Sequence, residues 1–202
     1  MEDVRKIARY LYVCYFKKIS QKIDEMKMHK LLYFMQRESL IETDKPLFEA
    51  QFHAWKYGPV LIEVREMYKN GVFRTDDDVD VDNTVRCVAD RIFEKYAEKE
   101  SWSLSNITHA EISWLRARKR DKKINGQNSN AVMTIEDIRM DAQRVKERRK
   151  SLAEGIQFVR NVPVLKVKLE HKTDKQIKLE GRTIGQLFGI FEDSEYDKKN
   201  KS

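Results

Sequence analysis

The chain has 202 residues, of which 41% are hydrophobic and 36% charged, and its net charge is +7. No apolar run approaches the ~20 residues that cross a bilayer, and the first six residues lack the pattern of a signal peptide, which excludes a transmembrane protein and argues against secretion. Two cysteines far apart in the sequence, Cys14 and Cys87, exclude a disulfide scaffold and favour a reducing cytoplasm.

Apolar residues recur at helical spacing through the first two thirds of the chain, and the sequence holds only seven glycines and three prolines. The spacing predicts a helix over residues 4–19, with Asp3 as its N-cap, and a central helix over residues 24–40. Gly58 and Pro59 end an aromatic-rich stretch. We expect Pro59 in the first turn of a third helix that stops at Asn70.

Five aspartates between residues 76 and 82 predict an exposed loop, since they lack the spacing of a calcium loop. A fourth helix is expected over residues 83–96. A turn over residues 101–105 then leads into short helices over residues 106–118. After a polar loop, Thr134 is predicted to cap a helix that extends to about residue 159.

The pattern changes after residue 161. Leu165, Val167 and Leu169 alternate with charged residues, which indicates a strand, and the last eleven residues are charged and predicted to fray. The sequence therefore predicts a mainly α-helical bundle domain over residues 1–160. A short appendage over residues 161–202, extended or resembling a β-hairpin, follows it.

Motifs that carry chemistry are absent from the sequence. The four histidines and two cysteines lack zinc-site spacing, and there is no phosphate-binding loop and no nucleophile elbow. We therefore expect no metal, no cofactor and no enzymatic activity. Basic stretches over residues 116–123 and 144–150 are typical of solvated faces, although they also permit contacts with nucleic acid phosphates.

Three segments carry a resemblance to a known family. They are residues 30–36 (KLLYFMQ), residues 52–60 (FHAWKYGPV), and residues 104–111 (LSNITHAE) followed by Trp114. Their order and spacing resemble the Panacea domain family, which includes SocA-like antitoxins and phage-associated proteins. The resemblance covers about residues 4–150 and departs from the family pattern at Ile112 and Ser113, where a proline is expected before the tryptophan.

The resemblance implies a compact, mainly helical antitoxin that neutralises a cognate toxin by direct protein–protein binding. SocA-like members resemble adaptors that deliver the bound toxin to a ClpXP-type protease, which gives a second hypothesis. A third hypothesis, from the basic stretches, is a DNA-binding regulator whose affinity falls steeply with salt. None of the three requires a membrane.

The family motif residues are interpreted mainly as core or cap, because apolar periodicity is chiefly a core signal. Thr108 is expected to cap a helix that begins at His109, with Glu111 in its first turn. The motif residues assigned to core or cap are Lys30, Leu31, Leu32, Tyr33, Gly58, Pro59, Thr108, His109, Glu111 and Trp114.

Two surfaces are candidates for the toxin contact. One is the aromatic segment of His53, Trp55, Lys56 and Tyr57, whose residue types are favoured in binding hot spots. The other is the appendage, where the strand of Leu165, Val167 and Leu169 either adds to a partner's sheet edge or packs on its own domain as a small hairpin.

Overall fold

The computed structural model describes residues 1–122 and 129–161. Within these residues the chain forms seven helices and three short strands, so the predicted mainly α fold is confirmed. The chain divides into two units, Met1–Lys146 and Glu147–Ser202. The predicted appendage, with Leu165, Val167 and Leu169, lies outside the described residues. No helix in the described part of the chain is long and apolar enough to span a bilayer.

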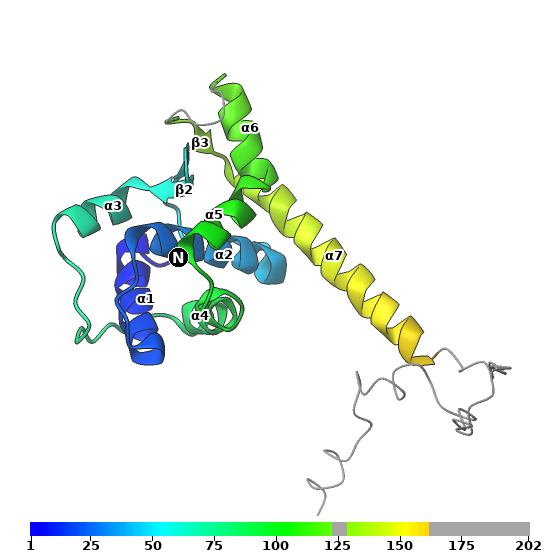
Figure 1. Cartoon of the computed structure of the whole chain (residues 1–202), viewed down its shortest axis with the longest axis horizontal. Helices are drawn as coiled ribbons and strands as arrows, with labels where there is room; N and C mark the ends of the chain where they lie inside the picture. The colour runs from blue at the N-terminus through cyan, green and yellow to red at the C-terminus, as the bar shows by residue number, and fades with distance from the viewer. Residues whose placement is uncertain (123–128, 162–202) are drawn as a thin grey trace, which may run out of the picture. The chain divides into compact units, whose positions relative to one another are not determined.

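A central helix organises the first unit. Helix α2 (Glu25–Thr43) begins at Asp24, whose side chain accepts a hydrogen bond from the Lys27 N–H, and residues 27–40 are buried. It contacts helices α1 (Val4–Ile19), α3 (Ile62–Lys69), α4 (Asn83–Tyr96) and α5 (Ser101–His109), as well as a strand (Figure 1). A helix buried on all sides is the centre of a bundle, as its broad apolar surface predicts.

A small antiparallel sheet packs against this bundle, with strand order β2-β1-β3. Strand β1 (Phe52–Trp55) pairs with β2 (Gly58–Leu61) on one side and with β3 (Val132–Met133) on the other. The expectation that Pro59 opens a helix is therefore wrong. Pro59 lies in edge strand β2, where a missing N–H leaves no ladder bond broken, and α3 begins at Ile62.

Helix α5 also differs from the prediction. Residues 101–105 form its first half rather than a turn, and the Thr108 hydroxyl donates to the Ser105 carbonyl in its last turn instead of capping a new helix. The side chains of Leu104, Ser105 and Thr108 are fully buried in the domain. Packing of this face outweighs the weak helix propensity of the serine-rich segment.

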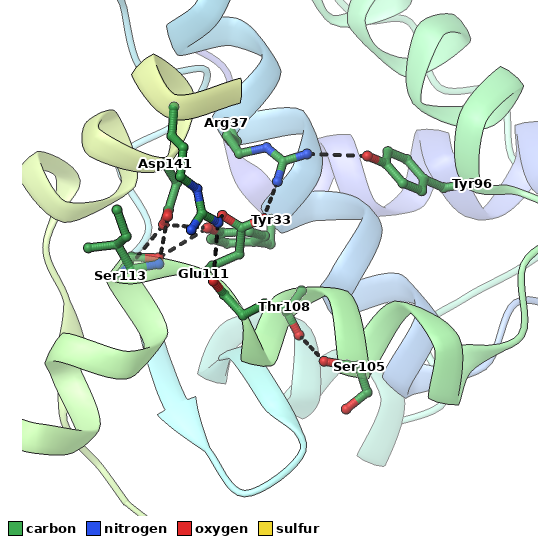
Figure 2. Close-up of polar contacts among 11 residues, drawn as sticks. Tyr33, Arg37, Tyr96, Ser105, Thr108, Glu111, Ser113 and Asp141 are labelled. Atoms are coloured by element: carbon green, nitrogen blue, oxygen red, sulfur yellow. Dashed lines mark hydrogen bonds and ion pairs between the residues drawn. The ribbon is translucent and has the colours of Figure 1, made fainter. Parts of the chain in front are cut away.

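The next helix, α6 (Ile112–Arg120), receives its N-terminal cap from a distant residue. The Asp141 carboxylate, on helix α7 (Ile135–Asn161), accepts hydrogen bonds from the backbone N–H groups of Ile112 (2.6 Å) and Ser113 (2.9 Å). Asp141 also accepts a hydrogen bond from the Tyr33 hydroxyl at 3.0 Å (Figure 2). The N-terminal part of α7 is thereby attached to both α2 and α6.

A buried ion pair lies beside this cap. The Arg37 guanidinium, on α2, pairs with the Glu111 carboxylate, and both side chains are at most 4% exposed. Arg37 also donates to the Tyr96 hydroxyl at 3.2 Å (Figure 2). Burial raises the pKa of Glu111 to about 7, Arg37 opposes this rise, and the neighbouring Asp141 adds to it. This network joins α2, α4, α6 and α7.

Candidate functional site

The turn between β1 and β2 lies directly against two helices. Gly58 has a φ of +101°, and a Cβ atom on it would lie 2.5 Å from Thr108 Oγ1 and 2.7 Å from Lys30 Cε. Only glycine fits both the positive φ and this close approach. The three sequence segments that carry the family resemblance therefore meet at one point.

Side chains from three helices hold the backbone of this turn by donating hydrogen bonds to its carbonyl oxygens. The pairs are Arg118 to Ala54 (3.1 Å), Trp114 to Trp55 (3.0 Å), Ser105 to Tyr57 (2.9 Å) and Lys30 to Pro59 (3.0 Å). Because these donors sit on packed helices, they hold the turn in one conformation. They engage only the backbone, so the side chains of the turn remain available.

His109 is part of this support. Its ring stacks on the Trp114 ring with a centroid distance of 4.3 Å. Burial lowers the pKa of His109, and a hydrogen bond to the Lys56 carbonyl partly opposes that shift. We therefore expect a neutral imidazole at pH 7, which acts as a positioning group for the turn.

The side chains on the outside of the turn form an aromatic cluster. Tyr57 is 43% exposed and contacts Trp102 of α5, which is 59% exposed, in an edge-to-face arrangement at 5.2 Å. The Lys56 ammonium lies 5.0 Å from the centre of the Tyr57 ring. We call Trp55, Lys56, Tyr57 and Trp102 the hairpin-turn surface.

A cavity of about 270 Å³ lies beside the turn, between the N-terminal half of α2 and α3. We call it the turn cavity, and its charged and polar lining residues are Glu25, His29, Lys30, Trp55, Lys56, Tyr57 and Arg65. The Arg65 guanidinium lies 4.9 Å from the centre of the Trp55 ring and 2.7 Å from a Glu25 carboxylate oxygen. The cavity therefore borders the hairpin-turn surface.

Burial lowers the pKa of two basic side chains that line the cavity. Burial lowers the pKa of Lys30 to about 7, and Asp24 and Glu25 partly oppose the shift. Burial likewise lowers the pKa of His29, whose Nδ1 accepts the Leu61 backbone N–H at 3.4 Å. His29 is therefore neutral at pH 7, and the proton of its ring lies on Nε2.

Of the seven residues predicted to contact the partner, three lie together at the turn, and three others lie outside the described residues. Trp55, Lys56 and Tyr57 lie on the turn, while His53 lies toward β3, where its Nδ1 is 3.0 Å from the Asn130 carbonyl oxygen. The predicted core residues Leu31, Leu32 and Tyr33 are fully buried. A role of the turn residues in partner binding stays a prediction.

Several residues of the site were missed from the sequence. Trp102 and Ser105 fall in the segment interpreted as a turn, and Arg65 and Arg118 look like ordinary surface charges. Burial alternates along β1 in the structure, with Phe52 and Ala54 inside. A period of two over four residues is too short to distinguish a strand from other structures.

The other candidate chemistries lack support in the described residues. No group of three or more His, Cys, Asp or Glu residues there is arranged to hold a metal ion. In the first basic stretch, Arg116 and Arg120 both pair with Asp137, while Arg118 is buried. These three arginines serve intramolecular contacts, and binding of nucleic acid stays a prediction.

Comparison with known families bears on the segment that builds the turn. Residues 28–115 match the family described as antitoxin SocA-like, Panacea domain. The resemblance inferred from the sequence is thereby confirmed. The Panacea match runs from the first turn of α2 into α6 and includes Lys30, Gly58 and Thr108. Searches of curated proteins and of solved structures returned no match.

Proposed function

We propose that the chain is a cytoplasmic, non-enzymatic antitoxin that neutralises a protein toxin by direct binding, and that the toxin docks on the hairpin-turn surface. The match to an antitoxin family supports the first part of this proposal. The observation that carries the second part is the turn itself, whose backbone is held by four side chains while the Tyr57 ring stays exposed beside Trp102.

Two physical arguments favour this surface. Tyrosine and tryptophan supply large contact areas and are enriched among the residues that dominate binding energy. A loop that is already ordered loses little conformational entropy when its partner binds, so more of the contact energy remains as affinity. Tyr57 and Trp102 combine both properties. Their rings contact each other, and the backbone of Tyr57 is held by the hydrogen bond from Ser105.

Growth rescue tests the proposal. We expect co-expression of the chain with the toxin encoded next to it to restore growth, and the double variant Tyr57→Ala/Trp102→Ala to lose this rescue. The variant Leu115→Ala is a matched control, since Leu115 is an exposed apolar residue of α6 (49%) that is not part of the surface.

The stability of the purified variants decides how this result is interpreted. Loss of rescue by a double variant that unfolds like the wild type supports docking at the turn, whereas full rescue by that variant overturns it. Measuring the half-life of the toxin with and without the chain separates neutralisation by binding from delivery to a protease. Faster degradation of the toxin would replace our proposal with the adaptor hypothesis.

A further inference from the structure

We propose that the turn cavity receives an acidic side chain, glutamate or aspartate, of the protein that docks on the hairpin-turn surface. This inference rests on the proposed function and adds the chemistry that the partner must present. It is carried by unused hydrogen-bond donors, by the charge of the lining, and by the position of the cavity.

Two N–H donors of residues that line the cavity lack a well-formed hydrogen bond to any described residue. The first is His29 Nε2, on a side chain that is 2% exposed. Its nearest carboxylate oxygen, on Glu25, is 3.6 Å away, a long contact through which Glu25 partly opposes the lowering of the His29 pKa. The second is the indole Nε1 of Trp55, which is also buried without a partner among the described residues. An unsatisfied buried donor is unfavourable and rare in folded proteins, so the unpartnered Trp55 indole N–H and the weakly bonded His29 N–H beside one cavity indicate a further acceptor.

The charge of the lining indicates that this acceptor is an anion. Lys30, Lys56 and Arg65 are basic, whereas Glu25 is the only carboxylate among the lining residues and is already bonded to Arg65. The Lys30 ammonium donates to the Pro59 carbonyl, its one hydrogen-bond acceptor in the described part of the chain, and so retains further donor capacity. A carboxylate offers two oxygens and a negative charge to this set of donors.

The position of the cavity indicates a protein side chain rather than a free anion. Trp55, Lys56 and Tyr57 belong both to the cavity wall and to the hairpin-turn surface. A protein that contacts the exposed Tyr57 ring therefore has its own side chains next to the cavity. The volume of about 270 Å³ accommodates a glutamate or aspartate side chain together with water, which occupies about 30 Å³ per molecule.

Titration of the full chain with a capped amino acid tests the inference without any toxin. The chain has three tryptophans, so a ¹⁵N–¹H spectrum contains three indole N–H signals, and the variant Trp55→Phe identifies that of Trp55. We expect N-acetyl-glutamate amide to shift the Trp55 signal saturably, while N-acetyl-glutamine amide, of nearly the same shape, does not. No shift with the acid, or equal shifts with both probes, would overturn the proposal.

Charge variants sharpen this test. Arg65→Gln is expected to weaken binding of the capped glutamate about tenfold. Its control is Lys69→Gln, which removes the same charge from the same helix at an exposed residue outside the cavity and should leave binding unchanged. Lys30→Met should weaken binding as well. Because Lys30 is buried and its variant could fail to fold, the result with Arg65→Gln decides; equal binding by Arg65→Gln and the wild type contradicts the proposal.

The two proposals fail in different ways. If growth is rescued but the capped glutamate does not bind, the acidic-side-chain inference is wrong and the docking function stands. If the capped glutamate binds but rescue is absent, the docking function is wrong, and a protein occupant of the cavity is wrong with it. In the complex with the toxin, one glutamate-to-glutamine or aspartate-to-asparagine change in the toxin should weaken binding to the wild type but not to Arg65→Gln.

Discussion

The domain has two polar centres on α2, one around Arg37 and one around Lys30. They differ in whether a carboxylate of the chain pairs with the buried cation. Lys30 and Arg37 lie seven residues apart on α2, which is two helical turns and therefore the same face. Arg37 faces the Glu111 carboxylate, and its charge is compensated within the fold. Lys30 contacts a neutral carbonyl, and burial lowers its pKa to about 7.

This difference separates a structural role from a recognition role. The ion pair of Arg37 and Glu111, with the Asp141 cap beside it, joins four helices and is formed entirely by groups of the chain itself. The turn cavity borders the Trp55 indole N–H, which no group in the described chain accepts, and a buried lysine with no carboxylate bonded to it, at the edge of an exposed aromatic surface. Compensation of charge by the chain's own residues thus distinguishes the centre that holds the fold from the one we propose for binding.

The largest expected effect is on the compensated centre. Arg37→Leu should reduce the free energy of unfolding by about 3–5 kcal/mol, because Glu111 loses its cation and must either stay charged in a buried site or take up a proton. The double variant Arg37→Leu/Glu111→Leu should lose less, since it removes both charges. Urea denaturation of both variants measures this. A double variant that is less stable than the single one would contradict the assignment of a buried ion pair.

The contact of the turn with its helices is tested by Gly58→Ala. We expect a loss of about 1–3 kcal/mol, because alanine at a positive φ is strained and its Cβ would meet Thr108 and Lys30. Gly71→Ala is the control: Gly71 also has a positive φ, but a Cβ on it has no neighbour within 4 Å. Equal losses for the two variants in urea denaturation would show that the turn is not closely packed.

The buried Lys30, which no carboxylate of the described chain bonds, predicts that stability depends on pH. Between pH 7 and 10.5 the unfolded chain holds a proton on Lys30 that the folded chain has released, so stability should rise with pH in this window. Relative to Lys30→Met, the free energy of unfolding of the wild type should rise by up to about 1.4 kcal/mol per pH unit. Denaturation in urea at pH 7, 8 and 9 measures the gain, and parallel pH profiles for the two proteins would rule it out.

Because of Glu111, we expect stability to fall, not rise, with increasing pH in a lower pH range. Its pKa is raised from 4.5 to about 7, so the folded chain binds its proton more tightly than the unfolded chain. This contribution to stability is present below pH 4.5 and is lost as the pH rises to 7. Comparison of the wild type with Glu111→Gln over pH 4.5–7 isolates it. A difference between the two proteins that stays constant with pH would contradict the raised pKa.

The smallest expected effect on stability belongs to the hairpin-turn surface. Trp102→Ala should change the free energy of unfolding by less than about 1 kcal/mol, since Trp102 is 59% exposed and its aromatic contact is with the exposed Tyr57. The same variant should clearly weaken toxin binding. A large loss of stability would show that Trp102 mainly stabilises the fold, and would remove it from the proposed docking surface.

Much of the helical framework was predictable because its signals are local. The spacing of apolar residues predicted α1, α2 and α4, and the caps Asp3 and Asp24 lie next to the helices that they begin. Asn70 was correctly predicted as the end of α3, although the helix begins later than Pro59. Helical periodicity and caps depend on residues within one or two turns, which a single sequence displays.

The candidate site was predictable only in part. The aromatic segment with Trp55, Lys56 and Tyr57 stands out by its residue types, but its strand–turn–strand conformation does not, since it rests on pairing with β3 and on donors from distant helices. The prediction of a helix that begins at His109, with Thr108 as its cap and Glu111 in its first turn, was wrong for the same reason, because α5 ends at His109 and Glu111 precedes α6. The cap of α6 comes from Asp141, 29 residues beyond Ile112, and no local pattern indicates it.

Composition and periodicity thus determined a mainly helical chain with a buried central helix, while the order and spacing of three motif segments carried the resemblance to the Panacea family. Only the tertiary structure decided that Lys30, Gly58 and Thr108 meet at one turn, and that Arg37 is paired while Lys30 is not. The physical reason is that helix formation follows from neighbours in sequence. Compensation of a buried charge depends instead on which distant groups the fold places within a few ångströms.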